Sequence, residues 1–268
     1  MTVISYNVWF SSMAQEDRYK KIISILLDRH PHVACFQEVI QPFVELVCAN
    51  KQIQDDYYVT EHPNNLYCRN RRNYGEMMLI SRALPRPKSV QFTEFDNSGQ
   101  GRRFLCAEWE KTTNLPTIGT VHLESLNHFS ERHNQLKTIS KVLAPFRHAL
   151  FMGDFNFCAY KDYGYDDGRE GEEKKKTEND LHFENAIPGF EDVWSLLPHD
   201  DEDKGYTFDS SLNKNIKVKA HDAPGGGEAQ EVWRIDRIAQ KKLNKTEKED
   251  GEGEGRWEVQ EMEVIGRE

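Results

Sequence analysis

Polar side chains with complementary chemistry follow several short apolar runs of this chain. Asn7 follows VISY, Glu38 follows VACF, and His122 follows TIGTV. Asp154 and Asn156 both follow ALFM. Because each buried strand carries its next residues to the rim of a sheet, we expect these five side chains to converge on one pocket.

Together these groups suit metal-assisted phosphoryl transfer. Glu38 offers a hard oxygen to Mg²⁺, which prefers one or two carboxylates together with water and phosphate oxygens. Asp154 would orient and deprotonate an attacking water. The carboxamides of Asn7 and Asn156 donate hydrogen bonds without a negative charge that would repel a phosphate. His122, neutral or cationic, would contact a non-bridging oxygen.

Each of these residues alone has a simpler interpretation. An Asp after a strand is usually a turn former or a helix cap. Glu38 alone would be a surface or salt-bridged carboxylate, and His122 alone a structural histidine. Only their joint placement favours a catalytic site.

The elements that would position these residues are short strands and two amphipathic helices. Ser12 and Gln15 have capping-box spacing and predict the start of a helix that ends before Pro31. Its apolar residues recur at helical spacing: Tyr19, Ile22, Ile23, Leu26 and Leu27. A second helix is predicted over Ser130 to Leu143. Strands are predicted at 3–6, 33–36, 77–80, 104–109, 117–121 and 149–152, and their order favours an α/β sandwich.

Composition describes a soluble globular chain with an uneven charge distribution. Of 268 residues, 37% are apolar and 30% charged, and the net charge is −10. Residues 162–203 hold 15 acids and 4 bases, residues 245–268 hold 9 and 4, and the remainder holds 21 acids and 27 bases. The body of the chain is therefore mildly basic, which leaves room for a nucleic-acid partner.

The same composition excludes several classes of protein. No apolar run approaches the ~20 residues of a membrane helix, and the N-terminus lacks the pattern of a secretory signal. The five cysteines form an odd set without a CxxC pair, which argues against a disulfide framework and a structural zinc site. A reducing compartment, cytosol or nucleus, is expected.

In order along the chain, SYN, FQEV, VHLES and GDFN resemble the endonuclease/exonuclease/phosphatase superfamily. The flanking runs ERHNQL, DVW, YTFD and RIDRI make the chain similar to the 5′-tyrosyl-DNA phosphodiesterases within it, from about residue 3 to 238. The resemblance implies a four-layer α/β sandwich, in which two mixed β-sheets pack face to face with helices outside. The segments 162–182 and 245–256 are charged and contain glycine, so we expect them to be solvated loops of one catalytic domain over residues 1–268.

The resemblance gives the rim residues specific roles. Glu38 would be the ligand of Mg²⁺, with Mn²⁺ as an alternative metal, and Asn7 would lie beside it at the phosphate. Asp154 and Asn156 would position the nucleophilic water, and His122 would bind the phosphate.

It also implies residues that contact the substrate. Ser125 matches a position that contacts DNA, and Arg102 matches a basic residue near the scissile bond. Tyr74 and Phe208 match aromatic residues that line the DNA groove. Asp236 matches the acid that orients a catalytic histidine.

The implied reaction is hydrolysis of the bond between a tyrosine oxygen and a DNA 5′-phosphate, as in trapped topoisomerase–DNA adducts. A phenol has a pKa near ~10, so phenolate leaves with less help than an alkoxide. The implied partner is DNA with a single-stranded 5′ end carrying a tyrosyl or peptide adduct, bound by a monomer in the nucleus or also the cytoplasm. RNRRNY (69–74) and GQGRRF (99–104) place arginines next to aromatic residues, as single-strand binding requires, although both would also suit solvated loops.

The chain departs from the family pattern at several positions. The family ends with an Asp-His pair that opens a last strand, and no such pair follows residue 238; His221-Asp222 has the reversed order. We therefore expect that strand to be missing and, for a chain ending at Glu268, a loss of ~10²–10³ in rate. Cys158 stands where the family often has Arg, two residues after the Asn of the GDFN motif. The family also often has an Arg two residues after the Ser of HLES, but here the run is SLNH, with one residue fewer. The start near the first strand suggests an excised catalytic domain.

Two other interpretations remain open. The chain could be another phosphodiesterase of the superfamily, such as an apurinic endonuclease or a lipid phosphodiesterase. It could instead be a DNA-binding scaffold without activity, given the absent Asp-His pair. The arginine-rich runs favour DNA over lipid, and the joint presence of Glu38, His122, Asp154 and Asn156 favours an enzyme.

Overall fold

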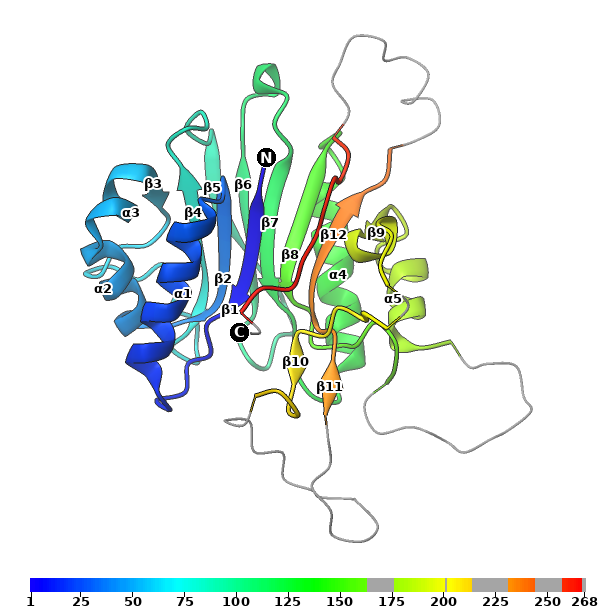
Figure 1. Ribbon diagram of the computed structural model, residues 1–268. Coiled ribbons are helices and arrows are strands. Elements are labelled where there is room, and N and C mark those ends of the chain that lie inside the picture. The colour runs from blue at the N-terminus through cyan, green and yellow to red at the C-terminus, as the bar shows by residue number, and fades with distance from the viewer. Residues whose placement is uncertain (163–175, 201, 214–230, 244–256, 267–268) are drawn as a thin grey trace, which may run out of the picture.

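Two β-sheets packed face to face form the centre of the protein (Figure 1). The computed structural model describes residues 1–162, 176–200, 202–213, 231–243 and 257–266. The smaller sheet has the order β1-β2-β4-β3 and contains β1 (Val3–Asn7), β2 (Val33–Val39), β4 (Gly75–Ser81) and β3 (Tyr57–Val59). Only β1 and β2 run parallel in it.

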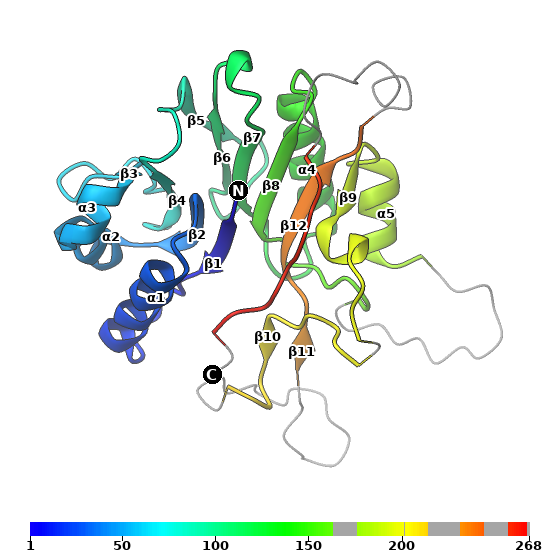
Figure 2. The same ribbon diagram turned by 45° about the horizontal axis from the view of Figure 1, so that its top comes forward.

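The larger sheet has six strands in the order β5-β6-β7-β8-β12-β9. They are β5 (Ser89–Glu94), β6 (Arg103–Glu108), β7 (Thr117–His122), β8 (Ala149–Asp154), β12 (Asp236–Lys241) and β9 (Phe190–Asp192). Its parallel pair is β7 and β8, and the other neighbours are antiparallel. A short ribbon of β10 (Phe208–Asp209) and β11 (Val232–Trp233) lies beyond the end of β12 in Figure 2.

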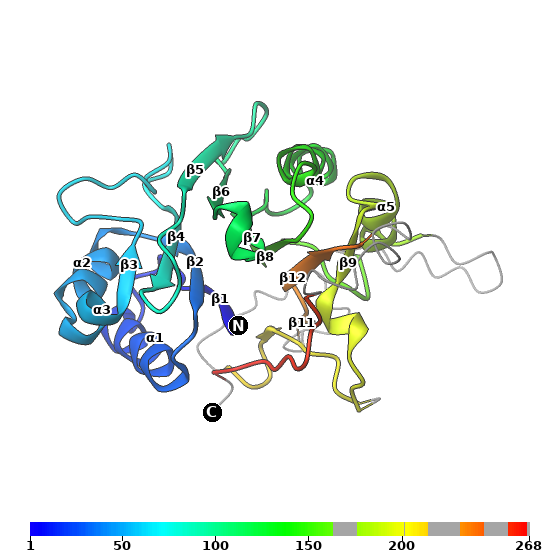
Figure 3. The same cartoon turned by 90° about the horizontal axis from the view of Figure 1, so that it is seen from above.

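Helices cover the outer face of each sheet, as the view from above shows (Figure 3). The smaller sheet carries α1 (Gln15–Arg29), α2 (Gln41–Ala49) and α3 (Lys51–Asp56), and the larger carries α4 (Phe129–Leu143) and α5 (Glu178–Asn185). Single turns of 3₁₀ helix occupy Lys111–Thr113 and Val193–Leu196. The predicted four-layer α/β sandwich is confirmed.

The buried side chains divide into clusters that match the layers. Strand side chains alternate between the two faces, so Ala34 and Phe36 of β2 pack under α1 and α2, whereas Val33 and Cys35 face the other sheet. The cluster between the sheets also includes Met152 of β8 and further residues of β4, β6 and β7. A third cluster joins α4 and α5 to the larger sheet. Each layer interface is therefore apolar, and polar groups gather at the strand ends.

The predicted strands and helices occur in the structure, but one helix start is wrong and several further elements were not predicted. The capping box of Ser12 and Gln15 is absent: Ala14 precedes α1 with φ 44° and no side-chain cap, because the loop before it is held by Arg18 instead. The elements that were not predicted are the strands β3, β5, β9, β10, β11 and β12 and the helices α2, α3 and α5. Among the longer strands, β5 has no fully buried residue and β12 carries charged residues, so neither shows an apolar run.

The charged segment predicted at 162–182 is a loop only in part. Its last residues belong to α5, which Thr177 and Asp180 begin with a reciprocal capping box. Residues 163–175, and the whole segment predicted at 245–256, lie outside the described residues.

Candidate active site

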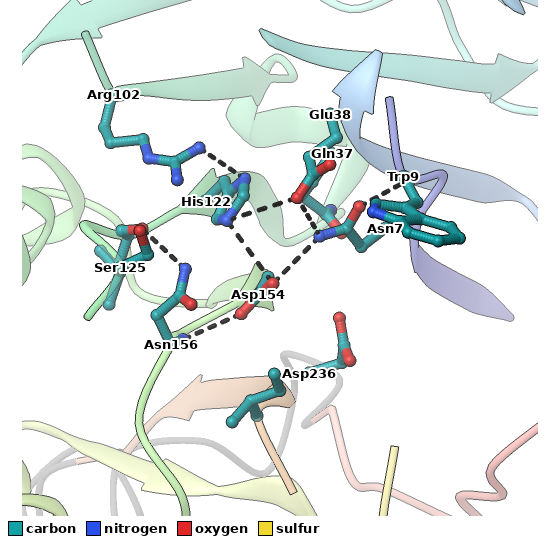
Figure 4. Close-up of polar contacts among 12 residues, drawn as sticks. Asn7, Trp9, Gln37, Glu38, Arg102, His122, Ser125, Asp154, Asn156 and Asp236 are labelled. Atoms are coloured by element: carbon teal, nitrogen blue, oxygen red, sulfur yellow. Dashed lines mark hydrogen bonds and ion pairs between the residues drawn. The ribbon is translucent and has the colours of Figure 1, made fainter. Parts of the chain in front are cut away.

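The rim residues come together where the parallel strands of both sheets end. In the strand registers Asn7 pairs with Gln37 next to Glu38, and His122 pairs with Asp154. Glu38 and Asn156 have φ of 56° and 53°, a left-handed conformation that costs free energy in residues other than glycine. Figure 4 shows Asn7, Glu38, His122 and Asp154 pointing toward one another. Four of the five predicted side chains therefore converge on one pocket, whereas the Asn156 carboxamide donates from Nδ2 to the Leu123 carbonyl (2.9 Å).

Asn7 bridges the two acids of the site. Its Nδ2 donates to Glu38 Oε1 and to Asp154 Oδ2, 3.0 Å each. Burial raises the pKa of both carboxyl groups, and the hydrogen bonds from Asn7 oppose that rise. The amides of Phe10 and Asn156 also donate, to Glu38 Oε2 (3.1 Å) and Asp154 Oδ1 (2.9 Å). Both acids are thereby fixed in position with oxygen lone pairs to spare.

The protonation of His122 follows from its contact with Arg102. Nη1 of Arg102 lies 2.6 Å from Nδ1 of His122, and a guanidinium only donates, so Nδ1 accepts and the ring proton sits on Nε2. That nitrogen lies 3.5 Å from Asp154 Oδ2 and 4.0 Å from Glu38 Oε1. Burial and then the Arg102 charge hold the pKa of His122 well below its usual value. His122 is therefore a neutral donor, and the cationic form is disfavoured.

A loop held by a buried acid presents Arg102. Glu124 accepts hydrogen bonds from Ser98 Oγ (2.7 Å), the Gln100 amide (2.8 Å) and Gln135 Nε2 (3.0 Å). Gln100 Oε1 in turn accepts from Arg102 Nη2 (2.9 Å). Neither Gln100 nor Glu124 was predicted to have a role, although Glu124 lies in the HLES motif. Its complete burial beside a basic loop is visible only in the structure.

Asp236 is a third acid at the same rim. It pairs with Asp154 in the register of β12 and β8, and its Oδ1 is buried without a hydrogen-bond partner among the described residues. Burial first, and then the negative charges of Asp154 and Glu38, raise its pKa to about 8. No described histidine hydrogen-bonds to Asp236, so its predicted partnership with a catalytic histidine stays a prediction.

The DVW and RIDRI motifs meet in a buried ion-pair network that holds β12 in place. Asp192 accepts from Arg234 Nη1 (3.1 Å) and Nη2 (2.7 Å), and from Arg237 Nε (2.9 Å) and Nη2. Burial would raise the pKa of Asp192, but the Arg237 and Arg234 charges outweigh it and lower that pKa to about 2. These motif residues therefore connect β9 to the strand that carries Asp236.

The site fits a hard divalent cation. One ligand atom each of Glu38, His122 and Asp154 lies within 4.8 Å of the others. Because Nε2 of His122 carries the proton, the carboxylates of Glu38 and Asp154 are the available ligands, and oxygen is the donor that Mg²⁺ prefers. The buried, partnerless oxygen of Asp236 is a further oxygen at the same rim, and a bound cation would favour the ionised form of that carboxyl group.

The predicted substrate residues divide into two groups. Arg102 lies over the ring of Tyr74 at 5.2 Å, and Ser125 Oγ accepts from Gln100 Nε2 at 2.6 Å, so these three surround the His122 side of the site. Phe208 instead lies on the β10–β11 ribbon, packed against a cluster that includes Cys158. The structure thus places Phe208 apart from the other aromatic residue.

The cysteines and the helices bear on two further expectations about the class of protein. All five cysteines are free, as the odd count suggested. Among the described residues, no helix is both long and apolar enough to cross a membrane.

Comparison with known proteins agrees with the motifs. Human tyrosyl-DNA phosphodiesterase 2 (TDP2) is 24% identical over 208 residues, which are 76% of this chain and 49% of that protein. The chain therefore spans about half the length of this curated relative. The crystal structure of D. rerio TDP2 with single-strand DNA product has a TM-score of 0.66 at 21% identity, over 92% of this chain and 85% of that one. C. elegans TDP2 has a TM-score of 0.64 at 19% identity, over 90% and 64%.

A family model for the Endonuclease/Exonuclease/phosphatase family matches residues 4–238. The predicted resemblance is confirmed by this match and by the likeness to human TDP2. The match runs from β1 into β12 and includes every rim acid, so the chain belongs to the endonuclease/exonuclease/phosphatase family.

Proposed function

We propose that this chain is a Mg²⁺-dependent 5′-tyrosyl-DNA phosphodiesterase. It hydrolyses the bond between a DNA 5′-phosphate and the tyrosine of a trapped topoisomerase, and leaves a 5′-phosphate for repair. Mn²⁺ would serve in place of Mg²⁺. The protein works as a monomer, in the nucleus and also in the cytoplasm. The observation that carries the proposal is the cluster of Asn7, Glu38, His122 and Asp154, which has the chemistry of phosphodiester hydrolysis.

Each residue of the cluster has a role that follows from its contacts. Asp154, held by Asn7 and the Asn156 amide, orients the attacking water and accepts its proton. Nε2–H of His122 donates to a non-bridging phosphate oxygen, and Arg102 keeps that tautomer in place. Glu38, with Asp154, would hold the divalent cation. When bound, that cation supplies Lewis acidity at the phosphate and offsets the charge that develops on the tyrosine oxygen.

The chemistry of the leaving group agrees with this set. The tyrosine leaves as a phenolate. Because the pKa of the phenol is about 10, an enzyme acid need not protonate the departing oxygen. His122 is buried and neutral and has no role as a general acid here. Electrostatic stabilisation therefore supplies most of the catalysis, as in other phosphoryl transfers.

The test is release of tyrosine from a 5′-phosphotyrosyl oligonucleotide under single-turnover conditions with Mg²⁺. Excess enzyme over substrate makes even a slow rate of tyrosine release measurable. We expect release by the wild type, none after EDTA, and a loss of at least ~100-fold for Glu38→Gln. An abasic duplex and a phospholipid analogue in parallel reactions check the other members of the family. Folded protein that releases no tyrosine while cleaving either of those substrates would refute the proposal.

A further inference from the structure

An exposed aromatic ring covers the aromatic residue that was predicted to line the DNA groove. The ring of Phe10 stacks on that of Tyr74, with centroids 5.0 Å apart and an interplanar angle of 15°. Phe10 is 47% exposed, whereas Tyr74 is 9% exposed. The aromatic surface that solvent, and a ligand, would meet at this point is therefore the free face of Phe10.

The backbone of the same loop is attached to the acids of the site. The Phe10 amide donates to Glu38 Oε2 (3.1 Å), and the Trp9 amide donates to Asn7 Oδ1 (2.9 Å). Arg18 fixes the loop from α1, since its guanidinium donates to the carbonyls of Trp9 (2.6 Å) and Ser11 (2.7 Å). The backbone of Phe10 is therefore fixed beside Glu38, which lowers the entropy cost of stacking a ligand on its ring.

Basic side chains flank this ring on the side of Tyr74. Arg102 lies over Tyr74, and exposed Arg69, Arg71 and Arg72 belong to the loop that leads into it. That loop is ordered by its own hydrogen bonds, from Arg69 Nε to Asn73 Oδ1 (2.7 Å) among others. It also approaches the loop of Arg102, since a Cβ on Gly101 would lie 3.3 Å from the Arg71 amide. A stacking ring next to exposed positive charges is the combination that binds single strands.

We infer that Phe10 is the stacking platform for the base of the first nucleotide at the single-stranded 5′ end. The inference rests on the proposed function and adds a specificity-determining residue to it. A base is favoured over the phenol of the leaving tyrosine because the platform continues into the arginine-bearing loop, which matches the alternation of bases and phosphates along a strand. The phosphates would lie along Arg69, Arg71 and Arg72 while the terminal phosphate occupies the site of Glu38.

The experiment measures binding by fluorescence anisotropy, in EDTA, to two 5′-phosphorylated single-stranded thymidine oligonucleotides. One carries a base at its first nucleotide and the other a tetrahydrofuran abasic residue there. The variants are Phe10→Ala, Phe10→Trp and, as a matched control, Met13→Ala, an equally exposed apolar residue of the same loop (44%). Thermal unfolding of each variant checks the fold.

We expect Phe10→Ala to weaken binding of the oligonucleotide with the base by about 5- to 150-fold, the range of base–aromatic stacking. Phe10→Trp should retain affinity, and Met13→Ala should bind as the wild type does. On the abasic oligonucleotide Phe10→Ala should lose nothing. With the phosphotyrosyl substrate the same variant should raise KM and leave the saturated single-turnover rate unchanged.

The outcomes separate this inference from the proposed function. If Phe10→Ala loses equal affinity for both oligonucleotides, the ring only supports the loop, and the inference is overturned. A loss that appears only with the phosphotyrosyl substrate would mean that the ring contacts the phenol, which also overturns the inference. If the wild type releases tyrosine but binds both oligonucleotides equally well, the proposed function stands and the stacking platform is refuted. A base-dependent loss in a protein that releases no tyrosine would support the platform and remove the function.

Discussion

Replacing Asp192 by Asn tests the link between the buried ion pairs and the active site. Asn has nearly the same shape, but it removes the charge that Arg234 and Arg237 share. Both guanidiniums are almost completely buried, with side chains 4% and 1% exposed. Removing one partner of a buried pair leaves uncompensated charge and costs about 3–5 kcal/mol in the free energy of unfolding. For a chain of this size that corresponds to a fall in Tm of roughly 6–20 °C.

The pH dependence gives a second, independent magnitude. The pKa of Asp192 is lowered from 3.8 to about 2 on folding, so its ionisation contributes about 2 kcal/mol above pH ~4. Because the folded pKa is the lower one, that contribution is present above the unfolded pKa and is lost as the pH falls toward 2. The difference in stability between the wild type and Asp192→Asn should therefore shrink between pH 5 and pH 2.5.

Urea unfolding followed by circular dichroism at both pH values measures these quantities. Glu191→Gln is the matched control, because Glu191 is the neighbouring acid of β9 and is only half-buried. It should change the free energy of unfolding by less than about 0.5 kcal/mol. A penalty for Asp192→Asn below 1 kcal/mol at pH 5, or one that is the same at pH 5 and pH 2.5, would refute the reasoning. In that case β12 and Asp236 are held by packing alone.

Other predictions concern the site itself. Glu38→Gln should lower tyrosine release at least ~100-fold while calorimetry shows a Tm no lower than that of the wild type, since burial already raises the pKa of Glu38; a large fall in Tm would contradict this. Arg102→Leu should move the acid limb of the kcat/KM profile to higher pH, because the loss of the Arg102 charge raises the pKa of His122; an unmoved limb would show that burial alone sets it. Glu124→Gln should loosen the loop that presents Arg102 and lower kcat/KM by about 10-fold, and unchanged kinetics would deny it a positioning role.

Local sequence determined where the main strands and the two long helices of this protein lie. The apolar runs predicted strands because strand burial depends on consecutive residues, and β7 and β8 occur where TIGTV and ALFM predicted them. The spacing of Leu136, Ile139 and Leu143 likewise predicted α4. The rim residues could be named because parallel strands end at a common edge. The predicted capping box was wrong because the loop before α1 is held by a residue within the helix. Arg18 donates hydrogen bonds to the carbonyls of Val8 and Ser11.

Only the tertiary structure decided how these residues act on one another. The tautomer of His122 depends on Arg102, which is 20 residues away in sequence. The network of Asp192 joins β9 to a strand more than 40 residues later, and Phe10 covers Tyr74 across two loops. Periodicity carries no information about such pairs, because a hydrogen bond or a stacked ring depends on the distance between atoms in space. The sequence by itself therefore determined which groups reach the rim, and packing between the two sheets decided their charges, partners and exposure.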